Sequence, residues 1–476
     1  MSLMLYALLL PLLVTFILPV FRPRAATLIS TLSFLIPAAV ALYGLLSTQI
    51  GEEVLFGVPH PVGDFYLLFD PISHAFGFTI SFVSAMVALY SLPYMRHRFE
   101  EMDAGKGEFR KYWFLYNLYA VSMLWLVYSG NLLLLYIFLE VSLLASFMLI
   151  YLYGYGNRQW VGILYFVWTH IAGVLALIGF LIIAFENQTL ALNGIKLIGF
   201  LPWLLIFLGM VVKLPGLGPH IWLPWAHAEA PTPVSALLSP LTVGLAGYIL
   251  LRIYLIDSSF IAQFRDLIIG YAIVSSIYAG LSVFRQRDYK RLLAYSTVSQ
   301  MGYVLIALCL GTYGLMGLVI QYMSHAFGKA ILFMTAGAII TAFHGLRSLD
   351  RMKGMHEFIP TISNAALLGF MTLSGIITIG MLAEFLILAG LTQVYGLNLA
   401  VISLVILVFV ISGLYSFYTM REIYYGTPLG YEKPKFSRLL DLPLYAIAFF
   451  SVAFIFPPLA PALLDGIRFV LGGVLP

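Results

Sequence analysis

The chain has 476 residues, of which 62% are apolar and only 10% are charged, with 25 Lys and Arg against 21 Asp and Glu. A soluble domain carries roughly 25% charged residues, so this composition excludes a soluble globular protein. The net charge of +4 is small and lies in short loops, which excludes a basic face broad enough for nucleic acid. The single cysteine, Cys309, lies in an apolar run. An internal disulfide, a CxxC metal site and a cysteine-ligated iron–sulfur cluster are therefore excluded.

Apolar runs of about 20 residues, the length of a membrane-spanning helix, follow one another along the chain. We predict an all-α polytopic membrane protein, one transmembrane domain over residues 1–476. The first run lacks a positive leader and an Ala-x-Ala cleavage site, so it is interpreted as a span and not as a signal peptide. About fourteen helices are expected, over residues 3–21, 26–47, 66–93, 112–129, 131–153, 160–185, 199–225, 232–255, 262–284, 291–310, 313–341, 362–394, 398–420 and 440–462.

The basic residues are distributed unequally between the two sides that these spans define. Nineteen of the 25 Lys and Arg residues fall in the loops that join odd to even spans. The opposite side has Lys196, Arg265 and Arg468, with Arg252 near the same surface. Because basic loops stay in the cytoplasm, both termini are predicted outside the plasma membrane and the loop over 96–111 inside the cell.

Two predicted spans contain residues that interrupt a helix. The seventh has two prolines between Lys213 and His220, and the twelfth has Ser374-Gly375 and Gly380 before Glu384. Broken helices in corresponding positions of two halves indicate inverted repeats around an ion or substrate site. We predict two inverted five-helix repeats with broken helices 7 and 12. The expected parts are helices 1–3 and a cytoplasmic loop over 1–111, helices 4–8 over 112–255, helices 9–13 over 262–424, and helix 14 over 440–476.

Four ionisable residues lie deep within the predicted spans, away from both membrane surfaces, namely Glu140, Lys213, Lys329 and Glu384. Each costs about 2.5 to 3.5 kcal/mol at the bilayer centre, so we expect them to mark an ion pathway. Glu140 and Lys213 are expected to form a coupled pair, in which the charge of the carboxylate decides whether the lysine keeps its proton. The alternative is a static ion pair that holds two helices together. For Glu384 the alternative is a polar group at a subunit contact.

Histidines near these residues are candidate relay groups. His325 lies one helical turn before Lys329 and titrates near neutral pH, although such a histidine can also simply bond a nearby carbonyl. His220 and His227 flank the exit of the broken helix, where a relay or a loop-capping role is expected. With Glu229 they match no standard ligand spacing, so we predict no metal and no cofactor. Asp70 is expected to cap the third span, with Pro71 in its first turn.

The run from Val212 to Leu238 resembles the signature of the antiporter-like subunits of respiratory complex I, Mrp cation/proton antiporters and membrane-bound energy-converting hydrogenases. Supporting matches lie at 69–73, 131–140, 290–302 and 325–333, so the resemblance covers nearly the whole chain. It implies fourteen helices, two inverted repeats, and ion translocation driven by redox chemistry in partner subunits or by a cation gradient.

The resemblance assigns Glu140 to the family's glutamate on helix 5, Lys213 to the lysine of helix 7, Lys329 to the lysine of helix 11, and Glu384 to the terminal glutamate of helix 12. Glu384, where some relatives have lysine, makes the chain look closer to the M-type complex I subunit and its hydrogenase counterparts than to the L-type. One departure is the helix 8 lysine of relatives, which is Leu245 here, while Ser239 stands at the position of their alternative histidine. Water, Tyr248, His220 or His227 are the candidate substitutes.

We therefore expect a subunit that translocates protons or sodium within a redox-driven complex and has no redox centre of its own. Its expected partners are other antiporter-like and redox membrane subunits, in a lipid bilayer and without nucleic acid. The alternatives are a subunit of an Mrp-type Na+/H+ antiporter, a non-conducting scaffold of such a complex, and an independent transporter of a small solute.

Overall fold

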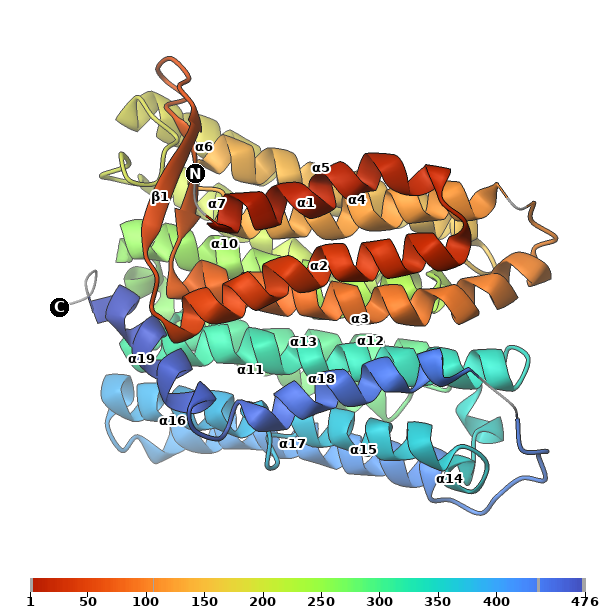
Figure 1. Ribbon diagram of the computed structural model, residues 1–476. Coiled ribbons are helices and arrows are strands. Elements are labelled where there is room, and N and C mark those ends of the chain that lie inside the picture. The colour runs from red at the N-terminus through yellow and green to blue at the C-terminus, as the bar shows by residue number, and fades with distance from the viewer. Residues whose placement is uncertain (1–2, 106, 435–436, 473–476) are drawn as a thin grey trace.

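The computed structural model describes residues 3–105, 107–434 and 437–472, and it is predominantly helical. The helices lie side by side, with the N-terminal and C-terminal halves of the chain on opposite flanks (Figure 1). The α-helices are α1 (Leu3–Ile17), α2 (Pro23–Leu46), α3 (Pro71–Glu101), α4 (Glu108–Tyr128), α5 (Leu132–Tyr153), α6 (Arg158–Asn187), α7 (Phe200–Lys213), α8 (Trp222–Glu229), α9 (Thr232–Leu237), α10 (Val243–Ile256), α11 (Ser259–Val283), α12 (Tyr289–Leu308), α13 (Gly311–Ala342), α14 (Met355–Phe358), α15 (Pro360–Leu373), α16 (Ile379–Tyr395), α17 (Leu399–Tyr424), α18 (Leu442–Ala453) and α19 (Leu459–Gly472).

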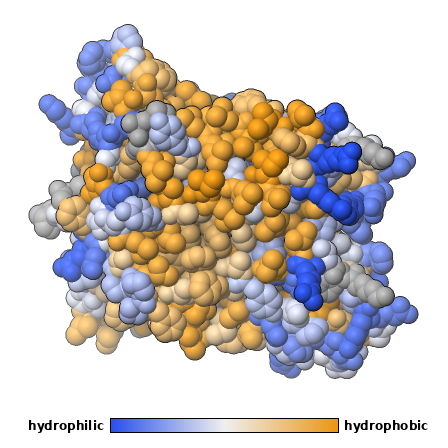
Figure 2. Space-filling view, in the orientation of Figure 1, coloured by the Kyte–Doolittle hydropathy of each residue, from blue (hydrophilic) through white to orange (hydrophobic). Residues whose placement is uncertain are grey.

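An apolar belt surrounds this bundle. Figure 2 shows hydrophobic side chains over the middle of the visible face and hydrophilic side chains gathered at its two ends. In the described part of the chain, nine helical segments are long and apolar enough to cross a membrane, and α7 and α16 are shorter apolar helices. The prediction of a predominantly helical, multi-pass membrane protein is confirmed.

Helices α3 and α13 form the centre of the bundle. Their apolar segments are almost entirely buried within the protein, whereas those of α1, α6 and α17 are less than half buried. A span that is buried on all sides contacts only other helices, so polar side chains on it need protein partners instead of water. The buried residues of α13 include His325 and Lys329.

Helix interruptions occur at both places where the sequence predicts them. Helix α7 ends at Lys213, and after a short loop and the 3-10 turn η2 (Pro219–Ile221) the chain continues as α8. Helix α15 ends at Leu373, and α16 begins at Ile379. A third irregularity, the π-helical turn η3 (Leu238–Thr242), separates α9 from α10 and contains Pro240, whose missing N–H prevents regular α-helical bonding.

A β-hairpin, which the sequence analysis does not predict, joins α2 to α3. Strand β1 (Gly51–Phe56) pairs antiparallel with β2 (Phe65–Phe69), and the hairpin crosses the helix ends at one end of the bundle (Figure 1). Four of the five β2 residues are buried. This apolar strand runs directly into the next helix, which explains why the sequence pattern extends the third span to residue 66.

Asp70 ends β2 and caps α3, as predicted. Its carboxylate accepts a hydrogen bond from the Ser73 N–H at 2.7 Å, and the Ser73 hydroxyl completes a capping box. The carboxylate also forms a two-bond ion pair with Arg252 of α10, at 2.6 and 2.8 Å. Arg252, which the charge distribution places near the outer surface, is 4% exposed. The pair therefore joins the start of α3 to α10.

Removal of one partner of this pair leaves an uncompensated buried charge, which costs about 3 to 5 kcal/mol. We expect Arg252→Met to lower the thermal unfolding midpoint of the purified protein strongly, and Asp70→Asn combined with Arg252→Met to restore part of the loss. The matched control is Arg287→Met, which breaks the exposed pair with Asp350 at 3.0 Å and should cost less than about 1 kcal/mol. Equal losses for Arg252→Met and Arg287→Met would contradict this role.

Candidate functional site: buried ionisable groups at the helix breaks

The first helix break places Lys213 at the last residue of α7, with a side chain that is 8% exposed. Side chains of other segments bond the backbone groups that the break leaves free. Trp222 Nε1 donates to the Val212 carbonyl at 3.0 Å, and the Tyr271 hydroxyl donates to the Leu217 carbonyl at 2.8 Å. The Leu217 N–H donates to Ser275 Oγ at 2.9 Å. This bonding lets the helix stop inside the protein.

Glu140, on α5, contacts a histidine of the neighbouring helix that the sequence analysis does not single out. His170 Nδ1 of α6 lies 2.7 Å from Glu140 Oε2, and the two side chains are 43% and 19% exposed. The other carboxylate oxygen has no hydrogen-bond partner among the described residues. Among the described residues, no ion pair within 4.0 Å joins Glu140 to Lys213. The two side chains are nevertheless close enough for an electrostatic interaction. The two groups are neighbours without direct contact.

A small internal pocket adjoins Lys213. It has a volume of about 10 Å³, and its lining includes Ser142, Thr169 and Thr242 besides the lysine. A volume of this size holds about one water molecule. The hydroxyls around it come from α5, α6 and η3, so the lysine at the end of α7 faces polar groups of three other segments.

Two buried histidines lie at the centre of the protein. Neither His227 on α8 nor His325 on α13 is more than 1% exposed, and none of their ring nitrogens has a hydrogen-bond partner in the described structure. The ring of His227 stacks on Phe333 at 4.7 Å, and Phe333 lies one helical turn after Lys329 on α13. The structure thus brings together His227, His325 and Lys329, which come from separate parts of the sequence.

Lys329 is fully buried, and its contacts are with neutral groups. Its ammonium group donates to the Leu293 carbonyl at 2.8 Å and to the Ser296 hydroxyl, both on α12. The backbone of Ser239, in η3, lies beside the His325 ring. The Ser239 hydroxyl forms a hydrogen bond of 2.7 Å with the Thr297 hydroxyl of α12. Leu245, in the place of the helix 8 lysine, is 0% exposed. The contacts of this region are therefore hydroxyls, carbonyls and imidazoles.

The second helix break places Glu384 over the loop between α15 and α16. A β-carbon on Gly375 would lie only 2.4 Å from Glu384 Oε2, and the φ angle of Gly375 is +64°. The close approach and the left-handed backbone both favour glycine at this position. Tyr303 and Tyr415 lie near Glu384. Glu384 lies apart from the first break, on an element of the second half of the chain.

A chain of amides extends from α13 to this second break. Gln321, one helical turn before His325, donates to Gln300 Oε1 at 2.6 Å. Gln300 Nε2 donates to the Leu373 carbonyl at 3.0 Å and to the Ser412 hydroxyl at 2.7 Å. Sequence analysis missed both glutamines and His170. A polar residue inside an apolar helix was the available signal for all three.

The other predicted residues have local partners. His220 Nδ1 accepts from the Gly218 N–H at 3.2 Å, a loop-capping contact beside Gly218 with φ of +98°. The Tyr248 hydroxyl accepts from Arg252 Nε at 2.9 Å and donates to the Val127 carbonyl, so Tyr248 belongs to the Asp70–Arg252 pair. Lys290, counted above as a loop residue, is buried and donates to the Ala230 carbonyl at the end of α8. Among the described residues, no three His, Cys, Asp or Glu side chains could hold a metal.

Fold and site define a multi-pass membrane protein with ionisable groups buried beside interrupted helices. The family described as NADH:quinone oxidoreductase/Mrp antiporter, transmembrane, matches residues 129–410. The family described as NADH-ubiquinone oxidoreductase (complex I), chain 5 N-terminus, matches residues 62–109. The chain therefore belongs to the NADH:quinone oxidoreductase/Mrp antiporter transmembrane family.

Individual relatives agree with this family. NADH-quinone oxidoreductase subunit M of Rickettsia felis is 29% identical over 347 residues, which are 70% of this chain and 69% of that protein. A chain of the membrane-bound sulfane sulfur reductase, an archaeal respiratory membrane complex, has a TM-score of 0.85 at 21% identity over 99% of both chains. A chain of the Mrp complex from Dietzia sp. DQ12-45-1b has a TM-score of 0.85 at 18% identity over 100% of this chain and 98% of that chain. These two structures share the fold.

The second break gives a prediction about Gln300. Gln300→Leu removes the bond to the Leu373 carbonyl and leaves the Gln321 amide without its acceptor, a loss of about 1 to 3 kcal/mol. We expect a lower unfolding midpoint and faster amide hydrogen exchange over residues 373–379. Thr79→Val on α3, which loses one buried bond of 2.8 Å to the Ala75 carbonyl, is the control and should leave that exchange unchanged. Unaltered exchange in Gln300→Leu would contradict the proposed support of the break.

Proposed function

We propose that this protein is the ion-translocating, antiporter-like membrane subunit of a multisubunit complex, and that the ion is a proton or sodium. One observation carries the proposal: Lys213 is buried at the first helix break, Lys329 is fully buried in the central helix α13, and half-buried Glu384 lies at the second break. Intramembrane ionisable residues are expensive and mark ion pathways. The family membership and the fold shared with complex I, Mrp and sulfane reductase subunits support the same function.

The first part of the route consists of Glu140, His170 and Lys213. An incoming proton on Glu140 or His170 removes the negative charge that favours charged Lys213, because an adjacent opposite charge stabilises the ammonium form. Lys213 then releases its proton toward the centre through water and the hydroxyls of its pocket. Coupling of this kind needs neighbouring charges without a permanent bond between them, which agrees with the absence of a Glu140–Lys213 ion pair in the described residues.

The central part of the route replaces the helix 8 lysine of relatives. His227 and His325 carry it, since both are buried near Lys329 and both ring nitrogens of His227 lack a hydrogen-bond partner among the described residues. An imidazole accepts a proton on one nitrogen and donates from the other, so it can pass a proton on. Ser239 and Thr297 supply hydroxyls beside His325. His220 and Tyr248, with their local bonds, contribute less to this route.

The last part of the route leads from Lys329 to Glu384. The Gln321–Gln300 pair spans from α13 to the second break, and Tyr415 lies beside both Gln300 and Glu384. Amides hold water molecules in place by donating and accepting hydrogen bonds. Glu384 is the terminal group, from which the ion leaves the subunit.

The proposed topology has fourteen spans. It adds α4, α12, α18 and the two broken helices α7–α8 and α15–α16 to the nine long segments. Each break then falls in the fourth helix of a five-helix repeat, 112–255 and 262–424, between an N-terminal part over 1–111 and helix 14 over 440–476. The positive-inside rule supports termini outside the plasma membrane, and the starts of α1 and α19 lie at the same end of the bundle (Figure 1).

The proposed partners are other antiporter-like and redox membrane subunits of one complex. A second candidate is a subunit of an Mrp-type antiporter, favoured by 29% identity over 84% of this chain to a putative antiporter subunit of Staphylococcus aureus, although this chain spans only 52% of that protein. Identification of the co-purifying subunits separates the two: redox subunits support the first candidate, and only Mrp-type proteins support the second.

The route predicts that Glu140→Gln and Lys213→Ala each lower ion pumping by the assembled complex at least about tenfold, because each removes a charge-changing group. Pumping is measured as acidification or sodium uptake in proteoliposomes, per electron transferred or per exchanged ion. Lys196→Ala, in an exposed loop, is the control. Pumping at the parent rate in both variants, with the complex intact, would refute the mechanism and leave a scaffold role.

Gly173 gives a milder test of the position of Glu140. A β-carbon on Gly173 of α6 would lie 2.1 Å from Glu140 Oε1, whereas one on Gly162 of the same helix would meet its nearest neighbour at 3.4 Å. Gly173→Ala therefore displaces the carboxylate from His170. We expect pumping to fall about tenfold, because the free energy of a hydrogen bond to a charged group corresponds to roughly that factor. Gly162→Ala should pump normally. Similar pumping in both variants would show that the Glu140–His170 contact is dispensable.

A further inference from the structure

Two loops at one end of the bundle form a rigid platform. The loop between α11 and α12 and the loop after α13 pair through a β-bridge between Asp288 and Ser348. The Tyr289 N–H donates to the Arg347 carbonyl at 3.1 Å, and the Leu349 N–H donates to the Arg287 carbonyl at 2.9 Å. These bonds hold side chains from distant parts of the sequence at one place.

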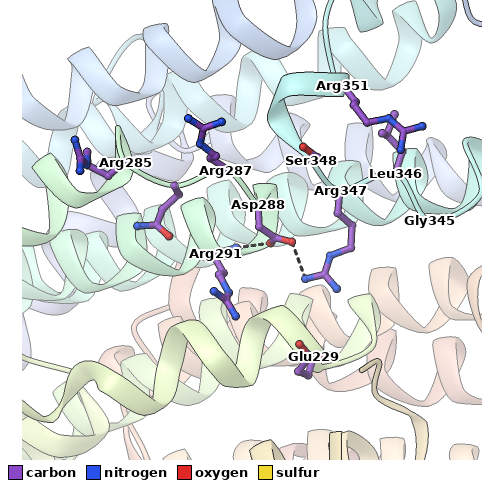
Figure 3. A pocket seen from close by; sticks show the side chains of 11 residues that line it. Glu229, Arg285, Arg287, Asp288, Arg291, Gly345, Leu346, Arg347, Ser348 and Arg351 are labelled. Carbon is purple, nitrogen blue, oxygen red and sulfur yellow. Dashed lines mark hydrogen bonds and ion pairs between the residues drawn. The ribbon is translucent and has the colours of Figure 1, made fainter. Parts of the chain in front are cut away.

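The platform carries a strongly basic pocket of about 720 Å³. Five arginines and two acidic residues line it, which leaves three positive charges in excess. Figure 3 shows the Arg291 and Arg347 side chains on either side of Asp288, pointing toward the ribbon that carries Glu229. Arg347 pairs with Asp288 at 2.8 Å, yet its Nε is buried without a partner. Arg285 and Arg351 are exposed and, among the described residues, form no ion pair within 4.0 Å.

The pocket lies at the ends of apolar helices. It is bounded by the end of α11, the start of α12 and the loop after the end of α13, immediately outside the apolar belt. Arg291 stacks on the Trp225 ring at 4.4 Å. Trp225 packs edge to face with Trp160 at 5.7 Å, and the two rings are 39% and 50% exposed. Exposed tryptophans at helix ends are typical of the membrane–water interface.

We propose that this pocket binds the phosphate-bearing headgroup of an anionic membrane lipid. Arginine forms bidentate hydrogen bonds with phosphate, and basic pockets between helix ends recognise anionic headgroups. The pocket volume lies in the range that accommodates a small organic group, more than a bare phosphate needs. The tryptophan pair beside Arg291 offers an apolar surface to the glycerol and upper acyl chain, which a soluble anion would not use.

The described residues that line the pocket do not include any residue of the proposed ion route. The pocket's ligand would neutralise the excess charge and hold the α11–α12 and α13–α14 loops together. The arginines bind the phosphate, whereas Trp225 and Trp160 contact the apolar part of the lipid. Substitutions can therefore test the charged and the apolar contacts separately.

Native mass spectrometry of the full chain, purified in mild detergent with its co-purifying subunits and stripped of lipid, tests the proposal. The probes are phosphatidylglycerol and phosphatidylcholine with identical acyl chains, and glycerol phosphate as the lipid-free anion. The pocket variant is Arg285→Gln with Arg351→Gln, both exposed positions, and Arg291→Lys keeps the charge while losing the bidentate geometry. Arg22→Gln with Arg24→Gln, exposed at the α1–α2 turn, is the control.

We expect saturable binding of phosphatidylglycerol over phosphatidylcholine in the parent and in the Arg22/Arg24 control. The affinity for phosphatidylglycerol should fall about tenfold in the Arg285/Arg351 variant, and by less in Arg291→Lys. Parent-like binding in both pocket variants would overturn the proposal. Competition by equimolar glycerol phosphate would also overturn it, in favour of a soluble anion. Unchanged lipid binding with loss of a co-purifying subunit would instead assign the arginines to an acidic protein segment.

Discussion

Every polar group inside a bilayer has to find its partner within the protein, and this constraint governs the structure. A helix that stops at Lys213 or Leu373 exposes backbone carbonyls and N–H groups that no water of the hydrocarbon region can bond. Side chains from other helices supply the missing bonds: Trp222 and Tyr271 at the first break, Gln300 and Ser412 at the second. The ionisable residues next to these breaks are therefore held in place by the packing of the whole bundle.

The buried charges divide into two kinds according to how completely they are satisfied. Asp70 and Arg252 share two short bonds, and the Ser73 N–H and the Tyr248 hydroxyl add further ones. Such a pair keeps both charges permanently. Glu140 has one histidine partner and an unbonded oxygen, and Lys329 has only neutral acceptors. Among the residues that the structure describes, neither group has the doubly bonded partner of opposite charge that Asp70 and Arg252 provide for each other, which agrees with the proposed ion route.

Much of the architecture could be predicted because hydrophobic length and helix-breaking residues act locally. The predicted spans match observed helices along most of the chain, the prolines after Lys213 do end a helix, and Asp70 does cap α3. The hairpin at 51–69 was missed because β2 is as apolar as a span and continues into one. The sequence also did not predict the partners of two candidate residues. His170 contacts Glu140, and the Tyr248 hydroxyl accepts a hydrogen bond from Arg252.

The sequence alone determined that this chain lies in a membrane and where its helices are interrupted, since both follow from apolar length and from helix-breaking residues, whereas the burial of Arg252 and Lys290 was not predicted. Only the tertiary structure decided which groups meet. His227, His325 and Lys329 become neighbours, Gln321 reaches Gln300, and five arginines converge on one pocket because helices far apart in sequence pack together. Residue types specify what a group can do, whereas packing between helices specifies its partner.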